Sequence, residues 1–184
     1  MQVKKNHIQI VLSVIVGLFF ACFGVFLFSN FQYRGLTIKE NVSPSFSGGT
    51  FNSFMYGIWF LLGSGFMADW FLEFSAANIA NSSISAILFG ETILPAFLTW
   101  FTAGFSIGVI VKGFKRGLSV SMVIFLSVFF LWLITGIFAG ADITAIFITN
   151  IANTLSEIFT VLISLIPGSI IGGLIRIRLG SIKK

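Results

Sequence analysis

The chain has 184 residues, of which 57% are apolar, 16% aromatic and only 9% charged, and its mean hydropathy is +1.03. A soluble domain carries about 25% charged residues, so a soluble chain of this composition could not cover its own surface. Composition therefore predicts one integral membrane domain with lipid as part of its solvent. The net charge of +5 does not indicate a nucleic-acid partner, because the basic residues collect beside apolar segments.

Cysteine and histidine usage excludes several chemistries. Cys22, the single cysteine, lies inside the first apolar run, and His7, the single histidine, precedes that run. One cysteine cannot form an internal disulfide, and one cysteine with one histidine cannot build a zinc, haem or iron–sulfur site within this chain. We therefore expect no cofactor and no metal.

Four segments are apolar for about 20 residues, which is the length that a helix needs to cross the hydrocarbon core. The predicted spans are residues 8–29, 92–111, 118–139 and 154–175. The expected fold is an all-α four-helix transmembrane bundle with a long extracytoplasmic connection over residues 30–91. The first span is longer than the core of a cleavable signal peptide, so we expect it to be retained as an anchor.

Three basic clusters predict the orientation of the spans. They hold nine of the 11 Lys and Arg residues: Lys4 and Lys5; Lys112, Lys115 and Arg116; and Arg176, Arg178, Lys183 and Lys184. The positive-inside rule places all three on the cytoplasmic side, which requires an even number of spans between clusters. We therefore expect a multi-pass protein of the plasma membrane with both termini cytoplasmic. A single extra span at 51–68 breaks this parity, whereas six spans, with 51–68 and 75–90 added, preserve it.

The outer connection divides into two parts. Residues 30–50 contain Pro44, Gly48 and Gly49, which favour loop or turn structure. Residues 51–74 are rich in aromatic side chains, and Trp and Tyr prefer the headgroup level of a membrane. This pattern predicts a helix in the outer interface, or a re-entrant hairpin formed with 78–90, that caps the bundle, docks a partner or lines a pore. The expected anchors are Trp59, Phe60, Trp70 and Phe71.

Small residues recur at four-residue spacing on every predicted span. The residues expected to pack helices are Gly17, Ala21, Gly104, Gly108, Gly136, Gly140, Gly168 and Gly172. Small side chains on one helix face let backbones approach closely in lipid, within the chain or against another subunit. The spacing Gly104-x3-Gly108-x3-Lys112 matches Gly168-x3-Gly172-x3-Arg176, which permits a duplication of two hairpins.

The acidic residues are the remaining candidates for chemistry. Ionisable groups in spans are functional candidates, and Glu91 and Glu157 lie near the outer ends of spans. They act either as carboxylates favourably placed at helix starts or as a cation or proton site with Asp142 or Asp69. Asp69 and Glu73 are i,i+4 neighbours if helical. Two sequons, at Asn41 and Asn81, are possible glycosylation sites on the outer side.

Nothing in the sequence forms a catalytic constellation, so we do not expect an enzyme. The leading hypothesis is a non-catalytic accessory or structural subunit of a larger membrane complex, docking through glycine-rich helix faces and the aromatic outer segment. The alternative is a small transporter or channel component that uses Glu91 and Glu157. Its expected partners are membrane lipid and other membrane subunits, or copies of itself.

Overall fold

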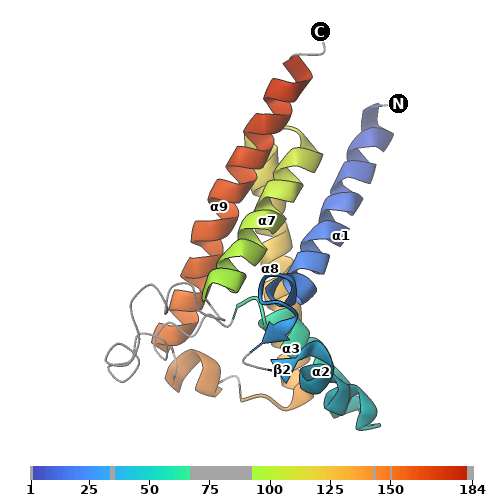
Figure 1. Ribbon diagram of the computed structural model, residues 1–184, viewed down its shortest axis with the longest axis vertical. Coiled ribbons are helices and arrows are strands. Elements are labelled where there is room, and N and C mark those ends of the chain that lie inside the picture. Colours follow the sequence, from blue (N-terminus) through green and yellow to red (C-terminus); the bar gives the residue numbers. More distant parts are fainter. Residues whose placement is uncertain (1, 34–35, 67–92, 143, 150, 182–184) are drawn as a thin grey trace.

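The structure, a computed structural model, describes residues 2–33, 36–66, 93–142, 144–149 and 151–181. Figure 1 shows long helices lying side by side and shorter elements gathered at one end. The elements in chain order are α1 (Gln2–Phe28), β1 (Gln32–Tyr33), β2 (Leu36–Thr37), α2 (Ile38–Ser47), α3 (Phe51–Gly63), α7 (Ile93–Val111), α8 (Phe114–Ala139), the π-helical turn η1 (Ala145–Thr149) and α9 (Ile151–Ser181).

Four of the described helices are long and apolar enough to cross a membrane, namely α1, α7, α8 and α9. The prediction of a helical, multi-pass membrane protein is confirmed at this level. The N- and C-termini lie at the same end of the molecule, and α2 and α3 lie at the other end (Figure 1). We call these the termini end and the cap end.

The interior is built mainly from α7 and the helices around it. Trp100 of α7 is 1% exposed and Ala21 of α1 is fully buried. Phe66, which follows α3, packs against Trp100 at a ring-centroid distance of 5.4 Å and against Trp132 of α8 at 5.8 Å. Aromatic rings in such tilted arrangements bury large areas and fix their mutual geometry. They bring the end of α3 together with α7 and α8.

Several hydroxyl groups in the interior bond to their own helices. Thr99 Oγ1 donates to the carbonyl oxygen of Pro95 at 2.7 Å, and Ser164 Oγ donates to that of Thr160 at 2.9 Å. A buried hydroxyl without a partner would be costly, and this i−4 bond removes the cost within one helix. The apolar spans can therefore carry these polar residues without a ligand or a partner helix.

The first part of the connection between α1 and α7 differs from the expected loop. After a two-residue antiparallel pairing of β1 with β2, α2 forms over a segment that contains Pro44. Thr37 and Glu40 form a capping box, in which each side chain accepts a hydrogen bond from the other residue's backbone N–H. The box satisfies donors at the helix start, and Gly49, with φ of +67°, supplies the left-handed turn after the helix. The helix start encoded by Thr37 and Glu40 therefore outweighs the turn preference of Pro44 and the glycines.

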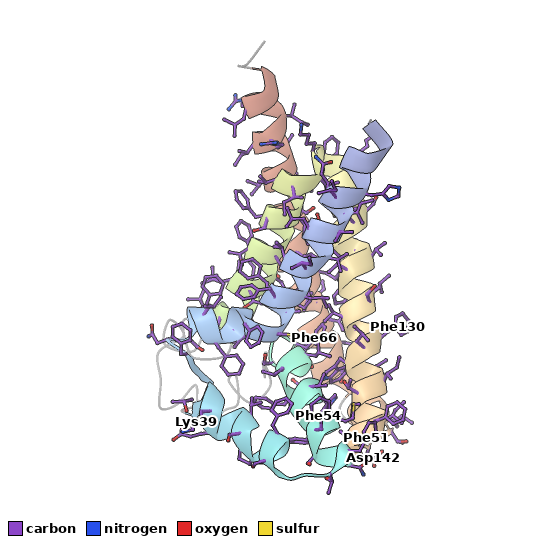
Figure 2. All side chains as sticks on the ribbon, turned by 90° about the vertical axis from the view of Figure 1, so that its right-hand side faces the viewer. Lys39, Phe51, Phe54, Phe66, Phe130 and Asp142 are labelled. Atoms are coloured by element: carbon purple, nitrogen blue, oxygen red, sulfur yellow. The ribbon has the colours of Figure 1, made fainter. Side chains whose placement is uncertain are left out.

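The aromatic segment begins with α3, whose start is capped by Thr50 and Ser53. Its far end is buried: Leu62, Ser64 and Phe66 are at most 5% exposed. Trp100 Nε1 donates to the carbonyl oxygen of Gly65 at 2.9 Å and so satisfies a backbone acceptor beyond the helix end. Phe51 and Phe54 lie nearer the cap end than Phe66 (Figure 2). The segment 78–90, expected to pair with α3 in a hairpin, lies outside the described residues.

Candidate functional site

Among the described helices, α7 and α9 come into close backbone contact at their glycines. A Cβ atom on Gly104 would overlap the carbonyl oxygen of Leu165, and one on Gly168 would overlap that of Phe101. Similarly, a Cβ on Gly108 would lie 2.8 Å from the backbone nitrogen of Gly173. Any larger residue at these positions must push the two backbones apart. The small-residue faces that carry these glycines are therefore occupied by contacts within the chain.

The contact has a reciprocal pattern. Gly104 follows Phe101 by three residues and packs on Leu165, while Gly168 follows Leu165 by three residues and packs on Phe101. The next turn repeats this: Gly108 meets Ser169, and Gly172 meets Phe105. The two helices run in the same direction, from the cap end to the termini end (Figure 1). The matched spacing noted in the sequence thus corresponds to a parallel, pseudo-twofold helix pair.

The start of α8 is tied to the same pair. Ser121 Oγ donates to Ser169 Oγ at 3.2 Å, and both side chains are fully buried. Gly117 lies one turn earlier, where a Cβ would be 3.0 Å from the Cα of Gly108. The basic turn between α7 and α8 is therefore held close to α9.

The other small residues have separate neighbours. Gly17 of α1 leaves room for Ile124, and Gly136 of α8 leaves room for the indole of Trp59. Ala21 belongs to the main hydrophobic core. Gly140 ends α8 in the left-handed conformation, with φ of +81°, and a Cβ there would meet nothing within 4 Å. Gly140 is thus a turn residue beside open space rather than a packing residue.

The expected aromatic anchors are partly turned inward. Trp59 is half-buried and stacks on Trp132 at 6.0 Å, and Phe60 packs on Val25, Phe26 and Ala96. Among the described residues, the buried Nε1 groups of Trp59 and Trp132 have no hydrogen-bond partner, so ring packing holds this pair together. Trp70 and Phe71 lie outside the described residues.

A different set of rings is exposed at the cap end, on α2, α3 and the end of α8. We call it the aromatic cap surface: Phe46, Phe51, Phe54, Tyr56 and Phe138. Phe46 and Phe54 meet edge to face at 5.4 Å, and Phe51 and Phe138 do so at 5.8 Å. Composition could not choose among the aromatics of residues 51–74. The phase of α3 separates them in the structure, because Trp59 faces Gly136 of α8 whereas Phe54 and Gly57 share the side that faces Phe46 of α2.

The candidate acids do not converge in the part that is described. Glu157 Oε1 accepts a hydrogen bond from Asn153 Nδ2 on the same helix at 3.2 Å. Asp142 Oδ1 accepts from the backbone N–H of Ala145 at 3.1 Å and is exposed. Glu91, Asp69 and Glu73 lie outside the described residues. Within the described ranges, no three His, Cys, Asp or Glu side chains gather as a metal site would require.

The two sequons fall in different settings. Asn41 lies within α2, and the next residue, Val42, is 7% exposed. A glycosylation acceptor is typical of a surface loop, so a helical position with a buried neighbour is a less favourable setting. Asn81 lies outside the described residues.

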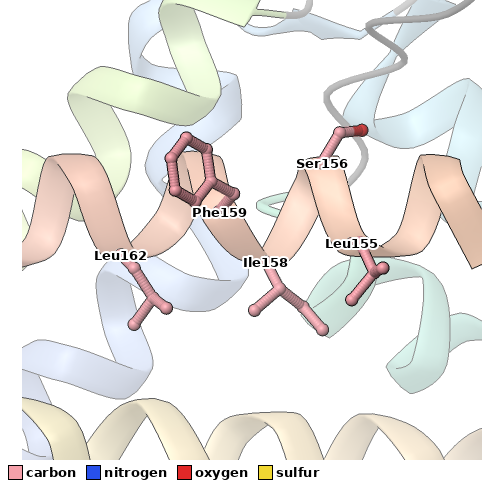
Figure 3. Close-up of a pocket in the computed structure, with 5 residues that line it drawn as sticks. All are labelled: Leu155, Ser156, Ile158, Phe159 and Leu162. Carbon is pink, nitrogen blue, oxygen red and sulfur yellow. The ribbon is translucent and has the colours of Figure 1, made fainter.

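The described surface includes a hollow along α9 and another at the cap end. One, of about 410 Å³, runs along α9 and is lined by Leu155, Ser156, Ile158, Phe159 and Leu162 (Figure 3). Its single polar side chain, Ser156, already donates to the carbonyl oxygen of Asn153 at 2.7 Å. This hollow offers no specific chemistry to a ligand.

The second hollow, of about 330 Å³, lies at the cap end and has a different character. It is lined by Tyr56 and Trp59 of α3, by Ala139, Gly140 and Ala141 at the end of α8, and by Asp142 and Ala145. We call it the cap pocket. It combines two aromatic rings with a carboxylate.

Comparison of the chain with known protein families, with curated proteins and with solved structures finds no match.

Proposed function

We propose that the protein is a non-catalytic subunit of a larger membrane complex and that it docks on its partner through the aromatic cap surface. In this proposal the four long helices form a transmembrane bundle in the plasma membrane. The basic clusters hold the termini and the turn between α7 and α8 in the cytoplasm. The cap end then lies on the outer side.

The observation that carries this proposal is the exposure of the cap rings. Phe51 is 59% exposed and Phe54 is 46% exposed, although both lie on a helix whose far end is buried in the core. Aromatic residues are enriched at the centres of protein interfaces, because they bury a large area at a small entropic cost. The cap rings also stand on helices with fixed ends, so the surface is preorganised.

The glycine faces have a different role in this proposal. Because Gly104, Gly108, Gly168 and Gly172 pack inside the chain, they make the bundle rigid rather than offer a surface to a partner. We therefore assign docking to the aromatic cap surface alone.

Photo-crosslinking in native membranes tests the proposal. The photoreactive residue p-benzoylphenylalanine replaces Phe54 in one variant and Phe130, a 58% exposed ring in the middle of α8, in a matched control. We expect one defined protein adduct from position 54, which disappears in the added background of Phe51→Ser, and only lipid adducts from position 130. Lipid adducts alone at both positions would show that the cap rings merely sit in the membrane interface, and the proposal would be wrong.

The end of α3 favours a second candidate, a small transporter or channel component. In the proposed orientation, α3 enters the bundle from the outer side as a re-entrant segment and stops at Ser64. Broken helices inside a membrane protein are tolerated where protein or water satisfies the backbone, and they often form solute sites. The hydrogen bond from Trp100 Nε1 to the carbonyl oxygen of Gly65 satisfies the backbone beyond the end of α3 in this way.

Flux measurements separate the two candidates. The purified chain, reconstituted alone in liposomes, transports no small cation if it is a docking subunit. Cation transport that is lost in Glu157→Gln and kept in Glu40→Gln would support the transporter hypothesis and contradict the accessory role. Glu40 serves as the control because it is exposed on α2 and because Gln also completes a capping box.

A further inference from the structure

The cap pocket has the size of a small-ligand site and an unusual lining. Its volume of about 330 Å³ is at the lower end of the range of about 300–1,000 Å³ for ligand pockets. Four of its seven described lining residues are Ala139, Gly140, Ala141 and Ala145, which have minimal side chains. The remaining three, Tyr56, Trp59 and Asp142, carry all of the distinctive chemistry.

The small residues create the space, and the backbone keeps it open. Gly140 closes α8 with φ of +81°, a conformation that side-chain-bearing residues rarely adopt, and a Cβ at this position would point into open space. The chain then turns through Ala141 and Asp142, whose Oδ1 accepts a hydrogen bond from the backbone N–H of Ala145. This bond positions the carboxylate, and the Asp142 side chain remains exposed.

The two rings of the pocket pack against aromatic neighbours. Trp59 stacks on Trp132 at an interplanar angle of 15°, so its ring cannot turn freely. Tyr56 stands beside it with ring centroids 5.6 Å apart and planes inclined at 54°. The two rings and a carboxylate line one hollow, and the face of an aromatic ring carries negative electrostatic potential. This arrangement attracts a cation that has an apolar surface.

Charge in the surroundings agrees with that preference. Among the described lining residues, Asp142 is the one that carries charge. Lys39 lies on the opposite side of the cap end from Asp142 (Figure 2). The pocket is therefore not neutralised by a lysine or arginine in its described lining.

We propose that the cap pocket binds a quaternary ammonium group, with Tyr56 and Trp59 facing its methyl groups and Asp142 balancing its charge. A trimethylammonium group suits both the volume and the rings, because its charge is spread over methyl surface that stacks on aromatic faces. The group can come from free choline or from the phosphocholine headgroup of a lipid. This site goes beyond the docking role proposed for the exposed rings. It shares Tyr56 with the aromatic cap surface, and choline binding to the purified chain tests it without any docking partner.

Calorimetric titration of the full chain, purified in a maltoside detergent that contains no ammonium group, tests the site. Choline and tetramethylammonium should bind, whereas 3,3-dimethylbutanol, the uncharged analogue of choline, should bind at least ~10-fold more weakly, since a cation–π contact contributes up to about 2 kcal/mol when desolvated. Equal binding of choline and its uncharged analogue to the unaltered chain would overturn the proposal without any mutation.

Two variants and a matched control locate the site. Asp142→Asn and Tyr56→Leu should each weaken choline binding by roughly 10-fold, a loss of about 1.4 kcal/mol, while Glu40→Gln should leave it unchanged. Unaltered binding in both pocket variants would place the site elsewhere and overturn the assignment.

Nanodiscs then distinguish the source of the group. A lower apparent affinity for choline in phosphatidylcholine than in phosphatidylethanolamine discs, which also carry no net charge, would show that a phosphocholine headgroup occupies the pocket. Equal affinity in the two discs would assign the pocket to a soluble cation. Both results agree with the proposed chemistry.

Discussion

Gly104 and Gly168 occupy equivalent positions in two parallel helices, and each packs against a backbone carbonyl of the other's helix, Gly104 on Leu165 and Gly168 on Phe101. Small residues at four-residue spacing are a common means of helix association in lipid. Here they join the second and fourth of the long helices of one chain. The pair forms the centre against which α1 and α8 are arranged.

This reciprocity predicts a non-additive response to mutation. Gly104→Ala and Gly168→Ala should each lower the free energy of unfolding by about 1–3 kcal/mol, because the added methyl group overlaps backbone atoms that cannot move independently. The double variant should lose less than the sum of the two, since one methyl already separates the helices. Unfolding in mixed detergent and dodecyl sulfate measures all three. A strictly additive loss would mean that the two glycines do not share one interface.

A second prediction concerns the aromatic core. Phe66→Ala should lower the free energy of unfolding by about 3–5 kcal/mol, because it removes a ring that is 3% exposed and contacts Trp100 and Trp132 and leaves a cavity. Phe54→Ala is the matched control, since its ring is 46% exposed, and should change stability by no more than about 0.5 kcal/mol. Equal losses in the two variants would contradict the buried position of Phe66.

The capping box of α2 predicts a pH dependence. The hydrogen bond from the backbone N–H of Thr37, followed by that from its side chain, lowers the pKa of Glu40 below its usual value of 4.5. A carboxyl group with a lowered folded-state pKa stabilises its helix fully above the unfolded value, and it loses this contribution as the pH falls through the folded value. The carboxyl carbon resonance of Glu40 should therefore titrate below 4.5 and shift upward in Thr37→Ala. The shift in Thr37→Ala is partial, because the variant keeps the backbone N–H of residue 37. A midpoint for Glu40 that is not below 4.5 in the unaltered protein would rule out the capping box.

Parts of this molecule could be predicted from the sequence for physical reasons. The four long helices are encoded by apolar length alone, a signal that does not depend on tertiary contacts. The sequence predicts a loop where α2 forms, because Pro44 and Gly48 are typical turn residues. Thr37 and Glu40, however, have the spacing of a capping box, which is typical of a helix start. Local residue preferences conflict there, and the capping pair prevails in the structure.

The cap pocket shows why the candidate site was harder to predict. Asp142 was singled out for its charge, yet its pocket neighbours Tyr56 and Trp59 come from a helix far away in the chain. Only the packing of α3 on α8 brings them together. The same packing turns Trp59 inward and leaves Phe51 and Phe54 outward. Counting aromatic residues could not separate these roles, because the direction of each ring depends on the phase of α3 against its neighbour.

The most direct test of the account is which side of the membrane each end of the molecule faces. Single cysteines are introduced by Ser47→Cys on the exposed surface of α2 and by Ser119→Cys near the start of α8, both in a Cys22→Ala background. In intact cells, a membrane-impermeant maleimide should label the cysteine at position 47. The cysteine at position 119 should react only after the cells are permeabilised. Labelling of position 119 from outside, or protection of position 47 in intact cells, would contradict the four-span arrangement with cytoplasmic termini.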